Sequence, residues 1–597
     1  MAEHFSKRTA TCGSLTKADD KKAVILNGWV HRHRDHGMIH FINLRDRYGI
    51  TQVIVDDDSS KELQQVALSL NLEDCISVTG VVRARPASMV NPEMATGEIE
   101  VKAEQIEILS TCAPLPFQID DGNVPREELR LKYRYLDLRT EGMKKRIKLR
   151  HDTVWAIRRY LSARGFYEIE TPTMIKSTPE GARDFLVPSR IHVGKFYALP
   201  QSPQLFKQIL MVGGMDKYFQ IARCYRDEDA RGDRQPEFTQ LDLEMSFVTR
   251  DDVLSTMEGL FGYVFKEVMD YDLPPTFRRF SYEEAMNTYG CDKPDLRFGL
   301  ELQDMNDLAS RSTFATFKEI VAQGGHVKAL CAPHSEIVDF SRKYITDLEN
   351  AAKVYGAHGL AWMKVGENNT INGGISKFFE GLQGEIIDRF DAKEGDMILF
   401  VAHKEWKKTC ASLSAVRSKL GKDLQLIRPG FEFCWIVDFP LFEYNEERGQ
   451  WEAAHHMFSM PQAEYIDTME EDPGKVKGDL YDLVLNGYEV ASGSIRIHDV
   501  ELQKRIFRIC NFDDETAQER FGFLLTAFSF SPPPHGGIAP GIDRIVMIMA
   551  GESSIHEVIA FPKNTAGISP MDDSPSFVEE KQLEELHLKI VYPEKKE

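Results

Sequence analysis

Two arginine-bearing blocks, far apart in the chain, constrain its fold more than any other feature. The first runs from Arg223 to Gln240, between two segments in which the character of the residues alternates with a period of two. Ile221, Arg223 and Tyr225 share one face before the loop, and Gln240, Asp242 and Glu244 share one face after it. Alternation of this kind is typical of half-buried strands. It predicts a β-hairpin with one polar, ligand-facing side.

The second block is glycine-rich and runs from Gly536 to Arg544. Glycines admit close approach of the backbone, and the apolar run Ile545–Met549 predicts a buried helix with Arg544 on its first turn. The N-terminal end of a helix favours an anion. Together the two blocks predict a clamp for a triphosphate.

The usual nucleotide and metal motifs are missing from the sequence. None of its three Gly-Lys pairs is followed by Ser or Thr, so there is no Walker motif. No GxGxxG opens a strand-to-helix unit, and no HExxH or paired CxxC supplies metal ligands. The clamp therefore differs from those of P-loop, dinucleotide-binding and zinc enzymes.

Length and charge narrow the class of protein. A chain of 597 residues should divide into three or more domains. The absence of a long apolar run and the polar start predict a cytoplasmic protein without a membrane span. A net charge of −20 argues against an indiscriminate nucleic-acid binder. Local contact with nucleic acid remains open, because basic residues cluster at 31–34, at 83–85, and at Lys144, Lys145, Arg146, Lys148 and Arg150.

Residues 21–110 alternate short strands with turns. Five such strands predict a small closed β-barrel of the oligonucleotide-binding type. On such a barrel Phe41 would stack on a base, and Gln52 or Arg34 would read one. The alternative is that Phe41 and Trp29 belong to the core. The expected strands are Val24–Val30, Ile39–Leu44, Gln52–Val55, Cys75–Val82 and Ile99–Ile108.

The remaining chain reads as a linker, a helix-and-strand domain and an insertion. Prolines mark a linker at Ala113–Arg126, and an apolar stripe predicts a helix over Lys144–Arg164. A strand is expected at Phe166–Thr171, and turn residues predict a loop at Thr178–Asp184. The mixed helix and strand patterns from 290 to 425 predict an inserted α/β domain.

Three segments in order resemble the motifs of the bacterial-type aspartyl-tRNA synthetases, which are class II aminoacyl-tRNA synthetases. They are Arg164–Pro172, Tyr225–Asp242 and Gly536–Arg544. The resemblance covers nearly the whole chain. It implies an α+β fold, with a class II antiparallel sheet flanked by helices, an N-terminal OB-fold β-barrel and an inserted α/β domain. The first motif would form a homodimer interface.

The resemblance also divides the chain. It implies an anticodon-binding OB-fold at 1–112, a hinge linker at 113–140, the two parts of the catalytic domain at 141–289 and 426–566, the inserted bacterial-type domain at 290–425, and a C-terminal extension at 567–597.

The family's nucleotide-binding roles carry over to particular positions. Arg226 would hold the ATP α-phosphate and the substrate carboxylate, and Phe238 would stack under the adenine while Arg544 covers its other face and reaches the γ-phosphate. Asp482 and Glu489 would bind Mg²⁺, which prefers hard oxygen ligands. The further ATP-binding positions are Asp227, Glu228, Gln235, Gly541, Ile542 and Asp543.

The same resemblance assigns the amino-acid pocket. Arg496 and Lys207 would grip the side-chain carboxylate of L-aspartate, for which bidentate arginine is well suited. Read singly, Asp242 would be a solvated residue and the histidine pair a core pair. In the family Ser202, Gln204 and Asp242 lie on the amino-group side, Glu180 belongs to the closing loop, and His455 and His456 line the pocket.

The implied reaction has two steps. The aspartate α-carboxylate attacks ATP to give aspartyl-adenylate and pyrophosphate, and the terminal ribose hydroxyl of tRNA(Asp) then attacks the acyl carbon. His36, on the barrel, resembles members that also charge tRNA(Asn). The alternatives are an asparaginyl- or lysyl-type enzyme, and a non-catalytic synthetase-like RNA-binding protein, which would lack Arg226, Asp482, Glu489 or Arg544.

Overall fold

The computed structural model describes residues 5–178, 181–229 and 231–592. Backbone contacts divide the chain into two compact units. The first comprises the chain through Lys148 together with 560–564 and 568–575, and the second comprises 149–559, 565–567 and 576 onward. The expected hinge therefore falls in the same unit as the barrel. Within the described part of the chain, no helix has the length and apolar character needed to cross a membrane.

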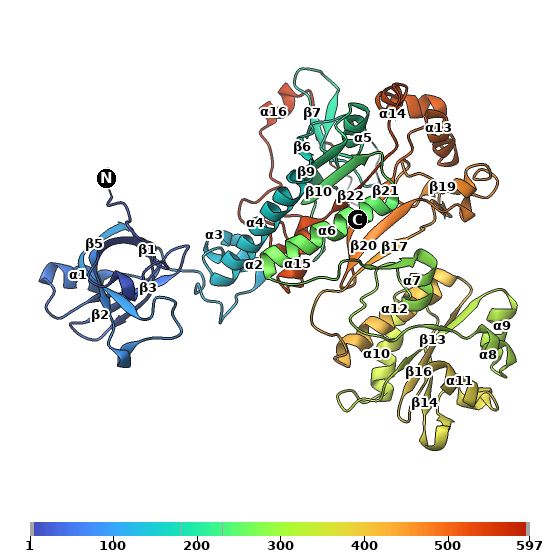
Figure 1. Cartoon of the computed structure of the whole chain (residues 1–597), viewed down its shortest axis with the longest axis horizontal. Helices are drawn as coiled ribbons and strands as arrows, with labels where there is room; N and C mark the ends of the chain where they lie inside the picture. The colour runs from blue at the N-terminus through green and yellow to red at the C-terminus, as the bar shows by residue number, and fades with distance from the viewer. Residues whose placement is uncertain (1–4, 179–180, 230, 593–597) are drawn as a thin grey trace. The chain divides into compact units, whose positions relative to one another are not determined.

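The N-terminal barrel, drawn in blue in Figure 1, is closed by five strands in the order β1-β2-β3-β5-β4. Closure leaves no free sheet edge. Alternate residues of β1 point inward, and Leu26 and Val30 pack with Ile42 and Val53 in the barrel core. The OB-fold prediction is confirmed. The strands are β1 (Ala23–Asp35), β2 (His40–Arg45), β3 (Ile50–Val55), β4 (Cys75–Ala84) and β5 (Ile99–Ser110), with helix α1 (Lys61–Ser69) between β3 and β4.

Two short helices follow the barrel, α2 (Glu127–Lys132) and α3 (Arg134–Asp137), and then the long helix α4 (Glu141–Ser162). The helix expected over Lys144–Arg164 is confirmed with its start one turn earlier. The strand expected at Phe166–Thr171 shortens to β6 (Tyr167–Glu168), which pairs at the edge of the next sheet.

The second unit is built on an eight-stranded sheet in the order β11-β17-β20-β21-β22-β10-β9-β6. Neighbours from β17 to β9 pair antiparallel, and the two edge strands β11 and β6 pair parallel. The predicted antiparallel sheet is thus confirmed except at its edges. Its strands, besides β6, are β9 (Lys217–Tyr225), β10 (Glu237–Ser246), β11 (Arg278–Ser281), β17 (Phe433–Val437), β20 (Leu480–Leu485), β21 (Tyr488–Ile495) and β22 (His535–Pro540).

One face of this sheet is apolar and carries helices. Leu241 and Leu243 of β10 pack with residues of α4, of α6 (Arg250–Met269) and of α15 (Ile542–Met549) in one continuous core. Figure 1 shows α4 and α6 running along the sheet. The helix predicted from the apolar run before Met549 is α15, and Arg544 is in its first turn, as expected.

The opposite face of the sheet is polar along β10, whereas at β17 and β20 it is apolar. Gln240, Asp242 and Glu244 alternate with the core leucines on β10, so the hairpin prediction is confirmed for this strand. Arg223 lies on the other side, because it pairs with Thr239 and donates to its hydroxyl at 3.1 Å. Helix α5 (Gln204–Val212) lies over the polar face and packs against β10.

The insertion forms a sheet of five strands, β12 (Gln303–Asp304), β13 (His326–Ala332), β14 (Ala361–Val365), β15 (Ile371–Asn372) and β16 (Met397–His403), in the order β12-β13-β16-β14-β15. One side packs on α10 (Arg342–Lys353) and α12 (Trp406–Asp423), and the other on α8 (Asn306–Arg311), α9 (Ala315–Ala322) and α11 (Gln383–Phe390). The expected α/β character is present.

The remaining elements are the hairpins β7 (Leu186–Pro188) with β8 (Phe196–Ala198) and β18 (Phe442–Asn445) with β19 (Gln450–Ala453), and the helices α7 (Tyr282–Tyr289), α13 (Val500–Ile509), α14 (Asp514–Phe528) and α16 (Glu580–Glu585). Among them, α7 and α13 pack against β17 and β20 in a second apolar core.

Candidate active site

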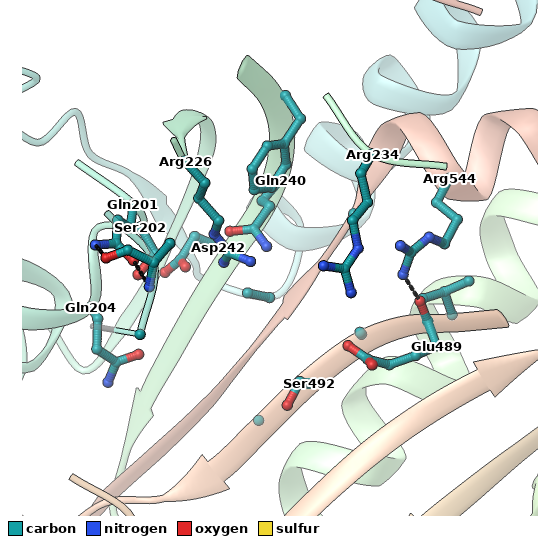
Figure 2. A pocket seen from close by; sticks show the side chains of 18 of the residues that line it. Gln201, Ser202, Gln204, Arg226, Arg234, Gln240, Asp242, Glu489, Ser492 and Arg544 are labelled. Atoms are coloured by element: carbon teal, nitrogen blue, oxygen red, sulfur yellow. Dashed lines mark hydrogen bonds between the residues drawn. The ribbon is translucent and has the colours of Figure 1, made fainter. Parts of the chain in front are cut away.

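A cavity of about 420 Å³ opens on the polar face of the large sheet. Its walls come from β10, β21, β22, α5, the loop between β9 and β10, and the first turn of α15. Side chains separated by more than 300 positions therefore meet in one space. Figure 2 shows Arg226, Arg234 and Arg544 along one side of it, with Ser202, Gln204 and Asp242 near one end and Glu489 near the other.

Most of the predicted site residues line this cavity. Those that line it are Ser202, Gln204, Lys207, Arg226, Glu228, Gln235, Phe238, Asp242, His455, His456, Glu489, Arg496, Gly541, Asp543 and Arg544. Asp227, Ile542 and Asp482 do not line it. Ile542 is a core residue, and Asp227 is half-exposed near Arg183. Glu180 lies outside the described residues.

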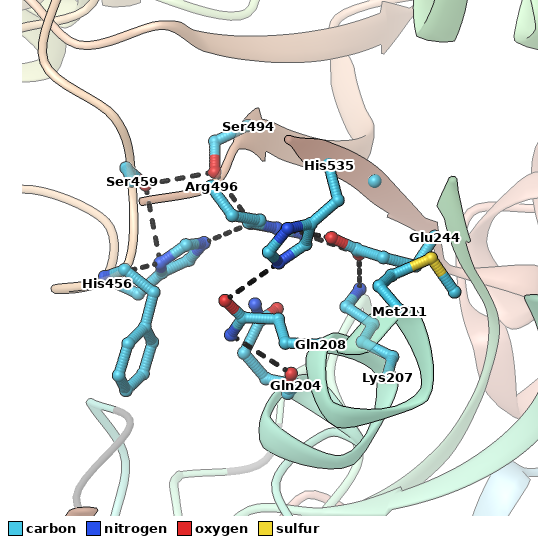
Figure 3. Close-up of polar contacts among 12 residues, drawn as sticks. Gln204, Lys207, Gln208, Met211, Glu244, His456, Ser459, Ser494, Arg496 and His535 are labelled. Atoms are coloured by element: carbon cyan, nitrogen blue, oxygen red, sulfur yellow. Dashed lines mark hydrogen bonds and ion pairs between the residues drawn. The ribbon is translucent and has the colours of Figure 1, made fainter. Parts of the chain in front are cut away.

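Four charged side chains are buried together at one end of the cavity, and Figure 3 labels three of them, Lys207, Glu244 and Arg496. Glu244 accepts hydrogen bonds from Arg496 at 3.0 and 3.2 Å, and its second oxygen lies 3.3 Å from the Lys207 ammonium. Lys207 also lies 3.0 Å from Asp242. All four residues are at most 1% exposed. We call Lys207, Asp242, Glu244 and Arg496 the buried charge cluster.

The two carboxylates of the cluster differ in their electrostatics. Burial opposes ionisation of both. For Glu244 the nearby Arg496 and Lys207 outweigh burial, so its pKa lies below the usual 4.5. For Asp242 burial outweighs Lys207, so its pKa lies above the usual 3.8. Oδ1 of Asp242 faces the Lys207 ammonium, and Oδ2 has no hydrogen-bond partner among the described residues, which leaves acceptor capacity at the cavity wall.

His456 is held beside this cluster as a neutral ring. Its Nε2 lies 2.7 Å from Nη1 of Arg496, and since arginine only donates, this nitrogen accepts. Burial, together with the positive charge of Arg496, puts the pKa of His456 well below 6.5. Burial also lowers the pKa of His455, whose Nδ1 is 3.4 Å from the Ser492 hydroxyl. Both histidines therefore contribute neutral rings to the wall at pH 7.

At the other end, two arginines flank the space expected for ATP. The Arg226 guanidinium lies over the Phe238 ring, 5.0 Å from its centroid. Arg544 donates to the backbone oxygen of Glu489 and lies 3.2 Å from an Asp233 carboxylate oxygen. A stacked or singly paired guanidinium retains donors for phosphate oxygens.

Asp482 and Glu489 provide two adjacent carboxylates. They lie on β20 and β21, which are neighbours in the sheet. Asp482 is 4% exposed, and one of its oxygens accepts no hydrogen bond from the described residues. Burial, with the Glu489 charge, raises its pKa well above 3.8. A bound cation would offset both the burial of the Asp482 carboxylate and its repulsion by Glu489. Two carboxylates fit Mg²⁺, which takes its other ligands from water and phosphates.

Larger metal-binding clusters are not found. In the described ranges, no three His, Cys, Asp or Glu side chains are grouped so as to hold an ion. The donor set at Asp482 and Glu489 is therefore suited to an ion shared with a substrate, and unsuited to a structural metal held by protein alone.

Sequence reasoning missed several residues of the cavity wall. Among them are Arg234, Asp233, Gln201 and Ser492. Arg234 lies within the first arginine block, eight positions after Arg226, which was an available signal. Gln201, next to predicted Ser202, bonds to Asp184 and to Ala182 and so shapes the loop after 181.

The predicted anticodon residues share one surface of the barrel. Arg34, Phe41 and Gln52 come from three neighbouring strands, and Arg34 pairs directly with Phe41. Phe41 is half-buried and outside the barrel core, against the alternative that it is a core residue. The His36 ring meets Phe41 edge-on, at 5.8 Å between centroids, and Gln52 donates to Glu100 at 3.0 Å.

Comparisons with known proteins agree with this geometry. A family model for class II tRNA synthetases (D, K and N) matches residues 126–565, and one for an OB-fold nucleic acid binding domain matches 24–109. A relative named aspartate–tRNA(Asp/Asn) ligase, from Treponema denticola, is 64% identical, covering 98% of this chain and 99% of its own. The aspartate–tRNA ligase of Macrococcus caseolyticus is 50% identical, covering 98% and 99%.

Solved structures support the fold at lower identity. The asparaginyl-tRNA synthetase of Pyrococcus horikoshii, complexed with asparaginyl-adenylate, aligns with a TM-score of 0.58 at 18% identity over 93% of this chain and 97% of its own. A putative aspartyl-tRNA synthetase of Leishmania major aligns with a TM-score of 0.59, at 18% identity over 94% and 95%.

Glu244→Gln tests the buried charge cluster. Because the folded pKa of Glu244 lies below its unfolded value, its ionised form adds stability above that value, and this is lost as the pH falls through the folded pKa. The variant should lose about 3–5 kcal/mol of unfolding free energy at pH 7 in urea titrations, and the difference should shrink below about pH 4. A difference in unfolding free energy that does not change with pH would contradict this. The control is Glu443→Gln, in an exposed pair with Lys407.

Proposed function

We propose that this chain, which belongs to the class II tRNA synthetases (D, K and N), joins L-aspartate to tRNA(Asp) through an aspartyl-adenylate. The observation that carries the proposal is the single cavity in which the buried charge cluster lies beside Arg226 and Arg544. One end offers cations to a small acidic side chain, and the other offers cations to a triphosphate.

The geometry favours aspartate over the related amino acids. The side-chain carboxylate would meet Arg496 and Lys207, and the ammonium would meet Asp242, whose Oδ2 has no hydrogen-bond partner among the described residues. Asparagine would place a neutral amide, one end of which is a donor, against donor-only Arg496 and Lys207 where aspartate offers a carboxylate, and a site built for one hydrogen-bonding pattern rejects the other strongly. The ammonium of lysine would be repelled by the same cations.

The same residues account for the chemistry. Arg226 would hold the α-carboxylate of aspartate against the ATP α-phosphate, so that attack occurs in line. Arg226 and Arg544 would stabilise the charge that develops on the phosphate oxygens, because their donors are already oriented in the cavity. Arg234, with its guanidinium on the same wall, would add a third cation near the phosphates. No covalent enzyme intermediate is needed.

A divalent ion would complete the site. Asp482 and Glu489 would hold Mg²⁺, which when bound neutralises phosphate charge and orients the pyrophosphate leaving group.

The second reaction requires tRNA. The barrel surface formed by Arg34, Phe41 and Gln52 would bind the anticodon by stacking and by contacts to base edges. An enzyme that supplies aminoacyl-tRNA to ribosomes would act in the cytoplasm. A non-catalytic role is disfavoured because Arg226, Asp482, Glu489 and Arg544 are all present.

Pyrophosphate exchange tests the first step. Exchange should depend on aspartate and should not occur with asparagine or lysine. Arg496→Met should lower kcat/KM for aspartate at least a hundredfold, since breaking a buried charge pair costs about 3–5 kcal/mol, with KM for ATP little changed. Arg505→Met, in a partly exposed pair with Glu470, is the matched control. Equal exchange with asparagine would remove the proposal.

Titration with Mg²⁺ tests the carboxylate pair. Asp482→Asn and Glu489→Gln should each raise the Mg²⁺ concentration needed for half-maximal exchange by about tenfold or more, as loss of a supporting ligand typically does. Asp514→Asn, which alters an exposed pair with Arg508, should have no such effect. An unchanged Mg²⁺ requirement in both site variants would place the metal elsewhere.

Charging of purified tRNAs tests the range of substrates. We expect the protein to aspartylate tRNA(Asn) as well as tRNA(Asp), and His36→Leu to lower kcat/KM for tRNA(Asn) about tenfold, since contacts to single bases are worth about 1–3 kcal/mol. Met38→Leu, on the same exposed turn, serves as control. Absence of any charging of tRNA(Asn) by the unaltered protein would refute relaxed specificity.

Sedimentation tests the proposed homodimer. Tyr167, in the first motif, is 64% exposed, and Trp155, on the helix α4 that precedes the motif, is 55% exposed; large exposed apolar side chains mark candidate interaction surfaces. A dimer covering them should exist at micromolar concentration, and Trp155→Arg should convert it to monomers. A monomeric unaltered protein would contradict the interface.

A further inference from the structure

We propose that Arg150, on α4, is a positioning residue for ATP, acting through Asp543 on the first turn of α15. The sequence places Arg150 at the end of a basic cluster that read as a candidate surface for nucleic acid. In the structure its guanidinium turns inward and is only 20% exposed.

Arg150 joins three parts of the active-site framework. One amino group contacts the Asp543 carboxylate, and the other donates to the Thr239 hydroxyl at 3.1 Å. The second Asp543 oxygen accepts the backbone N–H of Thr239 at 2.7 Å. Arg150 also reaches the Val558 carbonyl at 3.5 Å. A single guanidinium therefore ties α4 to β10 and to α15.

The residues tied together flank the nucleotide end of the cavity. Thr239 stands between Phe238 and Gln240, and Asp543 precedes Arg544 directly in sequence. Of these five residues, all but Thr239 line the cavity. Both Asp543 oxygens are occupied by Arg150 and Thr239. The carboxylate of Asp543 thus acts on ATP through its neighbours, by fixing the start of α15 against β10.

Charge is the second part of the argument. Asp543 is 5% exposed in its side chain, so without Arg150 it would be a buried carboxylate lacking its cation. It would then repel the triphosphate across the cavity wall and compete with phosphate for the adjacent Arg544. Aspartate should be affected much less, because it would meet the buried charge cluster at the opposite end.

Pyrophosphate exchange separates this role from a general structural one. Arg150→Gln should raise KM for ATP about tenfold or more, while KM for aspartate stays within about twofold. Arg150→Lys keeps the positive charge but loses the planar guanidinium with its several donors, so its rise in KM for ATP should be smaller. The double variant Arg150→Gln with Asp543→Asn should recover part of the loss, because the uncompensated charge is gone. ATP binding by calorimetry should follow the same order.

The matched control is Arg159→Gln, on the same helix, where the arginine pairs with Glu267 and both side chains are more than 40% exposed. Thermal unfolding of every variant reports stability. If Arg150→Gln does not fold, the comparison uses Arg150→Lys and Asp543→Asn, and an equal rise of both KM values in Arg150→Lys overturns the proposal.

Two further results would overturn it: an unchanged KM for ATP in Arg150→Gln, or no recovery in the double variant. The inference rests on the proposed function. If the unaltered protein does not exchange pyrophosphate, the proposed function is contradicted. If the unaltered protein exchanges normally and the variants give either of the two results above, only the role of Arg150 is contradicted.

Discussion

The buried charge cluster of Lys207, Asp242, Glu244 and Arg496 is the constraint on which the rest of the site depends. Each of these groups would be strongly unfavourable in the interior alone, and they are tolerated because cations and carboxylates alternate within about 3 Å of one another. Their meeting requires α5 above the sheet and strands β10 and β21 nearby. The fold is therefore committed to this arrangement before any substrate arrives, which is the condition for electrostatic preorganisation.

Cations held in place by protein partners also occur along the rest of the cavity, although the chain is acidic overall. Arg544 is held beside Asp233, Arg226 lies over Phe238, and Arg150 neutralises Asp543. Carboxylates orient Arg544 and Arg150, and the Phe238 ring orients Arg226. A substrate anion would then replace or join a partner already in place, and little reorganisation would be required. Asp482 and Glu489 are the exception, since burial and the Glu489 charge outweigh the cation Lys293 in their effect on Asp482, and this sets the pair apart as the candidate metal site.

The local secondary-structure elements could be predicted from sequence patterns. The barrel strands, the apolar face of β10 and helix α15 follow from periodicities of two and 3.6, which depend on neighbours in the chain. The pairing and register of strands are harder to predict from the sequence. Arg223 lies on the opposite side of the hairpin from Gln240, because the register between β9 and β10 is decided by the loop. Arg150 and Gln201 act through partners distant in sequence, and no local pattern marks them. The resemblance supplied most of the site residues, while their hydrogen bonds and burial came from the structure.

The most direct measurement of the central claim is a crystal structure with a non-hydrolysable analogue of aspartyl-adenylate. The account predicts the side-chain carboxylate of the analogue against Lys207 and Arg496, its ammonium against Asp242, and its phosphate beside Arg226, all within the cavity on the polar face of the sheet. An analogue bound at another surface, or bound here with its carboxylate remote from Arg496, would contradict the account.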